Sequence, residues 1–332
     1  MMTGWLLRVI LLATLMLMPG SLHADEKPIM LTLATWGALS HPHEKEFVDR
    51  FIKAAVRESG GRLAFKYFPS GSMVKQDDVV SAVPGGLVDI ALMIIDSWAG
   101  INHDVSITAT PLWTLSMEQS RTQLVPGQPL YEYFSDIMEK NNVKLLCLLD
   151  IGPPVIATRF PLTKPEDLNG KVVRALSKSS AENLQALKSS PIVMGVGQVY
   201  AALQRHTVDG AMNGIQGSIG LRYYEVADYE LATGGVLGTV VSGYIMNLKK
   251  YQSLPPDLQS AILRAANETR AHTQDYIITT YPNFLTEAKK RGMKVFEIEK
   301  GTPSWDGWQS ALTRYKNDIR ATYSSALLRL MP

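Results

Sequence analysis

Three polar side chains stand alone among apolar neighbours in the second half of the chain. Arg174 ends the segment KVVR, Asn213 follows VDGAM, and Gln216 comes shortly after it. An arginine at the end of a strand offers a planar fork of N–H donors that matches a carboxylate in two parallel hydrogen bonds. These residues therefore indicate a binding site for an organic anion. The alternative is a structural salt bridge from Arg174 to Glu166 or Asp167.

The sequence contains no motif of covalent or metal-assisted catalysis. The patterns GxSxG, HExxH, GxGxxG and GxxxxGK[ST] are absent. His41 and His43 come nearest to a metal pair, but their flanks predict the start of a helix. Asp89 or Asp209 could serve as the base of a periplasmic hydrolase or lyase, yet each belongs to a Val-Asp turn that favours a structural role. We expect no catalytic residue, no metal and no cofactor.

One pattern of residues occurs twice along the chain. The stretches DVVSAVPGGLVDIAL and QVYAALQRHTVDGAMNG share apolar and aspartate positions 120 residues apart, as Asp89 and Asp209 are. Each stretch predicts a helix, a turn and a strand. Ligands of open α/β sheets bind beyond the carboxyl ends of the strands. Asn213 is therefore expected to face a crevice.

The spacing of apolar residues predicts alternating strands and helices, which is typical of α/β lobes with largely parallel sheets. The expected helices are 42–59, 77–83, 180–188, 199–205 and a long one beginning near Pro255 and Pro256. The expected strands are 29–35, 62–68, 88–95, 155–158, 171–175, 191–194, 208–213, 240–248 and 293–298.

Length and composition indicate a globular protein of two lobes. At 332 residues the chain exceeds the usual size of one domain, and it is 46% apolar and 19% charged with a net charge of +2. No dense basic stripe predicts nucleic-acid binding. We expect residues 25–150 with about 236–280 to form one lobe, and residues 151–235 with about 281–332 to form the other.

The first residues predict export. An apolar run from Val9 to Met18 follows Arg8, so residues 1–24 are interpreted as a signal peptide, with an uncleaved anchor as the alternative. The single cysteine, Cys147, excludes an internal disulfide and is expected to be a small buried hydrophobe. A periplasmic location follows from this interpretation.

Several segments together resemble the solute-binding subunits of TRAP (tripartite ATP-independent periplasmic) transporters. They are PLTKPEDLNGKVVRA, PIVMGVGQVYAALQRHTVDGAMN, YYEVADY and SLPPDLQSAILRAA, and the similarity extends over nearly the whole mature chain. The resemblance implies an α/β, two-lobed, type II-like periplasmic binding protein with discontinuous domains and a long helix spanning the lobes. It also implies a monomeric receptor, not an enzyme, that delivers an organic acid to small and large membrane subunits for uptake driven by an ion gradient.

The resemblance also implies roles for two residues. Arg174 matches the arginine that pairs with the ligand carboxylate, and Asn213 matches a ligand-contacting asparagine. Pro154 stands where many dicarboxylate and sialic-acid members have a second arginine. We therefore expect a monocarboxylate, such as an aromatic acid or a 2-oxo acid.

The rest of the predicted pocket is apolar. Trp36, Ile94, Ile95 and Val196 are expected to line it, with Gln216 as a further contact. The alternatives are a C4-dicarboxylate or sugar acid, with Arg159 or His41 supplying a second cation. A receptor for an ABC importer or a sensor kinase is a further alternative.

Overall fold

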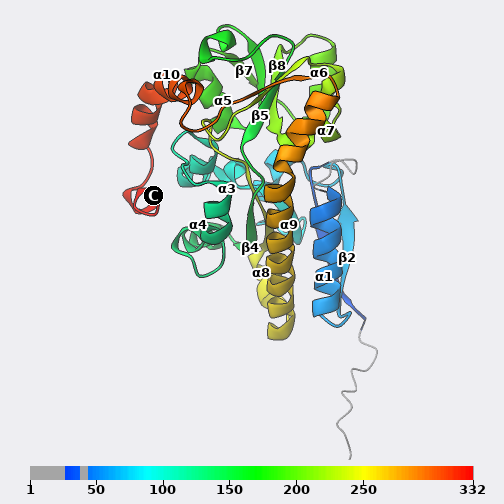
Figure 1. Ribbon diagram of the computed structural model, residues 1–332. Coiled ribbons are helices and arrows are strands. Elements are labelled where there is room, and N and C mark those ends of the chain that lie inside the picture. The colour runs from blue at the N-terminus through cyan, green and yellow to red at the C-terminus, as the bar shows by residue number, and fades with distance from the viewer. Residues whose placement is uncertain (1–26, 38–43, 332) are drawn as a thin grey trace, which may run out of the picture.

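A computed structural model of the chain describes residues 27–37 and 44–331 and shows two lobes joined by a long helix (Figure 1). The predicted signal peptide, residues 1–24, lies outside the described residues, as do His41 and His43.

The first lobe is built on a sheet of order β2-β1-β3-β10-β4. β1 runs parallel to β2 and β3, whereas β10 runs antiparallel to β3 and β4. Cys147 lies in β4 and is fully buried, as expected. The bounds are β1 Ile29–Ala34, β2 Leu63–Phe68, β3 Ile90–Ile94, β4 Val143–Asp150 and β10 Val241–Asn247.

The second lobe is built on a sheet of order β11-β9-β5-β8-β6-β7. β6 runs parallel to β7 and β8, but β5 runs antiparallel to β8 and β9. Both sheets are thus mixed, because each has one inner strand, β10 or β5, that follows a crossing from the other lobe and runs antiparallel to its neighbours. The bounds are β5 Pro154–Thr158, β6 Val172–Ala175, β7 Ser190–Val193, β8 Gly210–Gly214, β9 Tyr229–Ala232 and β11 Lys294–Glu297.

Helix α9 spans both lobes, with Pro256 in its first turn (Figure 1). Its Ile262 packs in the core of the first lobe and its Ala288 in that of the second. None of the helices in the described part of the chain is long and apolar enough to cross a bilayer. The helices are α1 Arg50–Glu58, α2 Val79–Ala82, α3 Met117–Gln123, α4 Pro129–Lys140, α5 Lys178–Ala186, α6 Val196–Gln204, α7 Ile215–Gly220, α8 Leu248–Ser253, α9 Pro256–Lys290, α10 Pro303–Arg320 and α11 Ser325–Leu328.

The repeated Val-Asp turn ties neighbouring parallel strands together in each lobe. The Asp89 carboxylate accepts hydrogen bonds from the backbone N–H and the hydroxyl of Thr32, at 2.7 and 2.8 Å. The Asp209 carboxylate accepts one from the Val172 N–H at 2.9 Å. The two aspartates immediately precede the inner strands β3 and β8. They therefore fix the starts of these strands, whereas the ends of the strands face the other lobe.

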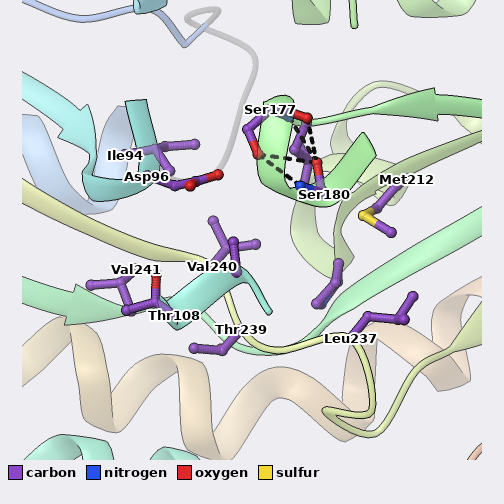
Figure 2. Close-up of a pocket in the computed structure, with 13 residues that line it drawn as sticks. Ile94, Asp96, Thr108, Ser177, Ser180, Met212, Leu237, Thr239, Val240 and Val241 are labelled. Carbon is purple, nitrogen blue, oxygen red and sulfur yellow. Dashed lines mark hydrogen bonds between the residues drawn. The ribbon is translucent and has the colours of Figure 1, made fainter. Parts of the chain in front are cut away.

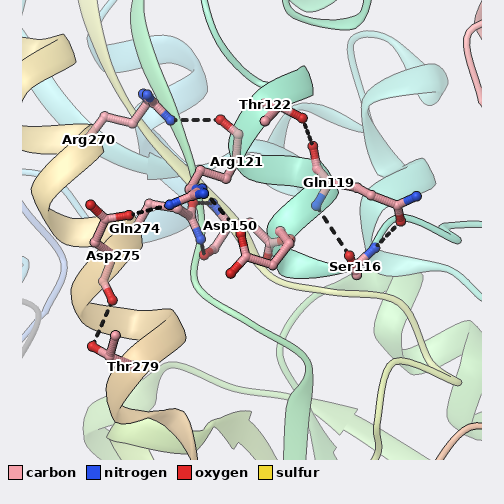
Figure 3. Close-up of polar contacts among 10 residues, drawn as sticks. Ser116, Gln119, Arg121, Thr122, Asp150, Arg270, Gln274, Asp275 and Thr279 are labelled. Carbon is pink, nitrogen blue, oxygen red and sulfur yellow. Dashed lines mark hydrogen bonds and ion pairs between the residues drawn. The ribbon is translucent and has the colours of Figure 1, made fainter.

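The chain crosses between the lobes at 150–154, at 232–241 and within α9, and Asp150 joins these crossings. Its Oδ1 accepts hydrogen bonds from the Gly152 N–H and from the Thr239 hydroxyl. Its backbone O and N bind the side-chain amide of Gln274 in α9, at 2.8 and 3.0 Å (Figure 3). The hinge is therefore a hydrogen-bonded unit rather than loose linkers.

The predicted boundary placed about residues 281–332 in the second lobe, but the last of these residues lie in the first lobe. Helix α10 packs against the second lobe, with Trp308 and Leu312 in its core. Tyr323 and Leu327 instead lie in the core of the first lobe, and the Ser324 N–H donates to the Asp104 carboxylate at 2.9 Å. Local sequence patterns do not show which lobe receives the residues that follow Arg320, the end of α10.

The buried Glu230 of β9 predicts a pH-dependent stability. Its Oε2 accepts a hydrogen bond from the Ser218 hydroxyl, and burial raises the pKa of Glu230 from 4.5 to about 7. The folded state binds this proton more tightly than the unfolded state, so its stabilising contribution is lost as pH rises through 7. We expect Glu230→Gln to raise the free energy of unfolding by about 3 kcal/mol at about pH 8.

Urea denaturation at about pH 5 and about pH 8 measures this effect, with the exposed Glu299→Gln as the control. A Glu230→Gln protein less stable than wild type at the higher pH contradicts the assignment.

Candidate functional site

Two adjoining cavities lie between the lobes. The Arg174 cavity is lined by Trp36, Gln76, Ile94, Ile151, Arg174, Leu176, Val196, Asn213, Gly214 and Val240. The Asp96 cavity, drawn in Figure 2, shares Ile94, Leu176 and Val240 with the first. It is further lined by Asp96, Thr108, Ala109, Pro154, Ser177, Ser180, Met212, Leu237, Thr239 and Val241. β3, β6 and β8 direct their carboxyl ends here, as open α/β sheets do at ligand sites.

Arg174 lies in β6 with only 2% of its surface exposed. Its Nε donates a hydrogen bond to the Met194 carbonyl at 3.1 Å, and its Nη1 donates to the Met212 carbonyl at 2.7 Å. These two bonds fix the plane of the guanidinium. Within the described residues Nη2 makes no hydrogen bond, so donors remain for a ligand.

The charge of Arg174 has no carboxylate partner among residues 27–37 and 44–331. Asp167, one of the candidates for a salt bridge, instead accepts hydrogen bonds from Thr163 and Lys164 at the surface. Burial lowers the pKa of Arg174, and electrostatic interactions with Tyr223 and Asp77 oppose this effect only in part. A buried cation whose nearest partners are carbonyl dipoles gains most from an anion placed beside it.

Asn213 lies beside Arg174 in the same cavity, at the end of β8. It is 6% exposed, and its Oδ1 accepts a hydrogen bond from the Gly214 N–H at 3.0 Å. Burial raises the pKa of the neighbouring Tyr223 to about 12, and the charge of Arg174 and the amide of Asn213 oppose this less strongly. Asn213 Nδ2 is buried and makes no hydrogen bond of good geometry in the described structure. Nδ2 is therefore a second donor available at this end of the cleft.

Trp36 and Val196 line the Arg174 cavity from opposite lobes. Trp36 follows β1 and is half-buried at the edge of the first lobe's core. Val196 is the first residue of α6 in the second lobe. The structure thus brings five predicted site residues together: Trp36, Ile94, Arg174, Val196 and Asn213.

Ile95 and Gln216 do not line either cavity. The strand β3 ends at Ile94, which faces the cleft, and a 3₁₀ turn then directs Ile95 into the core of the first lobe. Gln216 lies in α7 and is 2% exposed, and its Nε2 is buried without a partner among the described groups. The predicted strand was one residue too long at this end, so Ile95 was expected in the pocket together with Ile94, whereas Ile94 alone of the two lines it.

Pattern analysis missed Asp96 and Thr108. Asp96 follows directly after the apolar run of β3, and its Oδ1 accepts a hydrogen bond from the Ser179 hydroxyl of the other lobe at 2.7 Å. Burial raises the pKa of Asp96, and hydrogen bonding to Ser177 and Ser179 opposes this less strongly. The sequence did contain a signal for Asp96, because a carboxylate follows the apolar strand there. Asn213 was predicted from the same kind of position at the end of a strand.

Arg159 lies away from this cleft. It lines a separate surface pocket with His206 and Glu225. Its guanidinium donates to the Val208 carbonyl at 3.2 Å and lies 3.7 Å from the Asp209 carboxylate. The position of Arg159 therefore does not support the alternative in which it binds a second ligand carboxylate.

Residues 33–316 match the family model described as bacterial extracellular solute-binding protein, family 7. The C4-dicarboxylate-binding periplasmic protein DctP of Rhodobacter capsulatus is 24% identical, covering 96% of this chain and 95% of the relative. This chain belongs to that family, as its sequence motifs predicted.

Solved structures show the same fold. DctP7 of Bordetella pertussis, a receptor binding pyroglutamic acid, has a TM-score of 0.81 at 16% identity, covering 91% of this chain and 99% of its own. A TRAP periplasmic solute binding protein of Ralstonia eutropha with bound (S)-2-acetolactate has a TM-score of 0.81 at 17% identity, covering 91% and 97%. The two-lobed, type II-like fold predicted from the sequence is confirmed.

The free amide of Asn213 predicts an orienting contact with a ligand. We expect Asn213→Ala to weaken ligand binding by about 1–2 kcal/mol, the value of one hydrogen bond. The melting temperature of the ligand-free protein should change little, because Nδ2 holds no other element. Calorimetry and thermal denaturation test both statements. Normal affinity with a large loss of stability would show a purely structural amide.

Proposed function

Because the chain belongs to the bacterial extracellular solute-binding protein family 7, we propose that it is the periplasmic receptor of a TRAP transporter. Its ligand is a small organic acid with one carboxylate, bound in the Arg174 cavity. The observation that carries this proposal is the Arg174 guanidinium, which is 2% exposed and has no anionic partner in the described structure. A bound carboxylate would supply that partner in a charge-assisted pair.

The charges of the cleft favour one carboxylate rather than two. Among the described residues that line the two cavities, Arg174 is the one cation and Asp96 the one carboxylate. Pro154, which stands where the family resemblance places the second arginine of many dicarboxylate members, lines the Asp96 cavity. A second ligand carboxylate would therefore be desolvated without a cationic partner and beside the Asp96 carboxyl group. Similar receptors bind acids of both kinds, such as pyroglutamic acid with one carboxylate and malonate with two, so the support for one carboxylate comes from the charges of this cleft.

The ligand would act by favouring a closed arrangement of the lobes. Trp36 and Ile94 contact the cavity from the first lobe, and Arg174 and Asn213 from the second. A ligand that touches both lobes stabilises the state in which they approach each other. The small and large membrane subunits of the transporter would then receive the acid from this closed form. No catalytic step is proposed, because Asp89 and Asp209 lie at the strand ends away from the cavities.

Substituting Arg174 should remove the anchor. We expect Arg174→Ala to weaken binding by about 2–5 kcal/mol, since a buried ligand carboxylate loses its charged partner. Arg174→Lys should rescue binding only in part, because an ammonium group cannot form the paired fork. Arg159→Ala is the matched control and should bind normally. Calorimetry on the folded variants measures all three affinities. An affinity of Arg174→Ala within about threefold of wild type would show that Arg174 does not bind the ligand carboxylate.

A panel of acids should separate monocarboxylates from the alternatives. Ligand at a thousand times its dissociation constant stabilises a protein by about 4 kcal/mol, which thermal denaturation detects readily. We expect 2-oxo and 2-hydroxy monocarboxylates to raise the melting temperature. Stabilisation by succinate, malate or sialic acid alone would contradict the monocarboxylate proposal and favour a dicarboxylate or sugar-acid receptor.

A further inference from the structure

The Asp96 cavity contains a carboxylate oxygen without a partner. Asp96 is 4% exposed, and its Oδ1 binds the Ser179 hydroxyl. Its Oδ2 has no hydrogen-bond partner in the described structure. Burial raises the pKa of Asp96 and a contact with Ser177 opposes this rise, although the Ser177 hydroxyl also lies 3.1 Å from that of Ser180. A carboxylate oxygen can accept two hydrogen bonds, so Oδ2 has room for a further donor. A buried acceptor of this kind is costly unless a donor reaches it.

Thr108 presents a second open oxygen to the same cavity. Its side chain is 1% exposed, and its Oγ1 is buried without a hydrogen-bond partner among the described groups. The Thr108 carbonyl, by contrast, is used, because it accepts from the Thr239 N–H at 2.7 Å. The backbone contact holds Thr108 in place while its hydroxyl remains available.

The two cavities therefore differ in polarity. Arg174 and Asn213, on the second lobe, offer N–H donors in the first cavity. Asp96 and Thr108, on the first lobe, offer oxygen acceptors in the second. Apolar side chains shared by both cavities, Ile94, Leu176 and Val240, lie between these polar ends.

We propose that Asp96 and Thr108 form a second ligand subsite, which accepts hydrogen bonds from a hydroxyl or ammonium group. The inference rests on the proposed function, since it places the ligand carboxylate at Arg174. The ligand is then a monocarboxylate whose short apolar middle carries a hydrogen-bond donor at the far end. An ammonium group would also neutralise the Asp96 charge, which no described cation contacts.

Matched acids and isosteric variants test this subsite. One set is pentanoate, γ-hydroxybutanoate and γ-aminobutanoate, and a shorter set is butanoate, β-hydroxypropanoate and β-alanine, each set equal in its number of heavy atoms. Calorimetry on the mature protein should show that the wild type prefers a donor-terminated acid over the methyl-terminated one. Comparison of the hydroxyl and ammonium members then distinguishes the two donors.

Asp96→Asn should weaken the preferred donor-terminated acid about tenfold or more and leave the methyl-terminated acid within about threefold. The asparagine keeps an oxygen for Ser179 but places an N–H₂ group where the acceptor was. Thr108→Val should produce the same selective loss to a smaller degree, and it provides an independent test if Asp96→Asn folds poorly. Ser179→Ala is the control, because it removes the hydrogen bond between the lobes and leaves Oδ2 in place.

Two results would overturn the inference. One is a wild-type protein with no preference for a donor-terminated acid over its methyl-terminated match. The other is an Asp96→Asn protein that weakens all acids equally, as expected if Asp96 only joins the lobes through Ser179. Binding by Arg174→Lys distinguishes this inference from the proposed function. If that variant binds more weakly than wild type, the proposed function stands even when either of these results is found. If it binds normally, the proposed function itself is contradicted.

Discussion

The buried charge of Arg174 is the constraint on which the cleft depends. Two backbone carbonyls, from Met194 and Met212, hold the guanidinium in one plane, and they offset only part of the cost of removing the charge from water. The second lobe thus buries a cation whose charge a bound anion would neutralise. Such a site is preorganised, so a ligand gains the charged pair without first ordering a flexible side chain.

The repeated Val-Asp turn explains why this charge faces the other lobe. In each lobe the aspartate ties the start of the inner strand to its parallel neighbour, through Thr32 in one case and Val172 in the other. Fixing that end sets the register, so the opposite strand ends of both lobes point toward the same crevice. A carboxylate in this position resembles a catalytic group in the sequence, but its hydrogen bonds show that it supports the sheet.

Much of the site could be predicted because its polar residues interrupt apolar strands. Arg174 and Asn213 were identifiable on that basis, and the structure places both in one cavity with Trp36 and Val196. The error at Ile95 came from the strand boundary, since a shift of one residue turns a side chain to the other face. The antiparallel positions of β5 and β10, and the return of Tyr323 to the first lobe, depend on contacts between distant segments that local patterns do not encode.

The separation of donors and acceptors has a consequence for closure of the lobes. Arg174 and Asn213 belong to the second lobe, and Asp96 and Thr108 to the first, so neither lobe alone offers both polarities. A ligand shifts a conformational equilibrium only by its difference in affinity for the two states. A simple carboxylate can satisfy the second lobe whether or not the first lobe approaches. A ligand that also carries a donor would gain its second set of hydrogen bonds only on closure. Selectivity and closure would then depend on the same contacts.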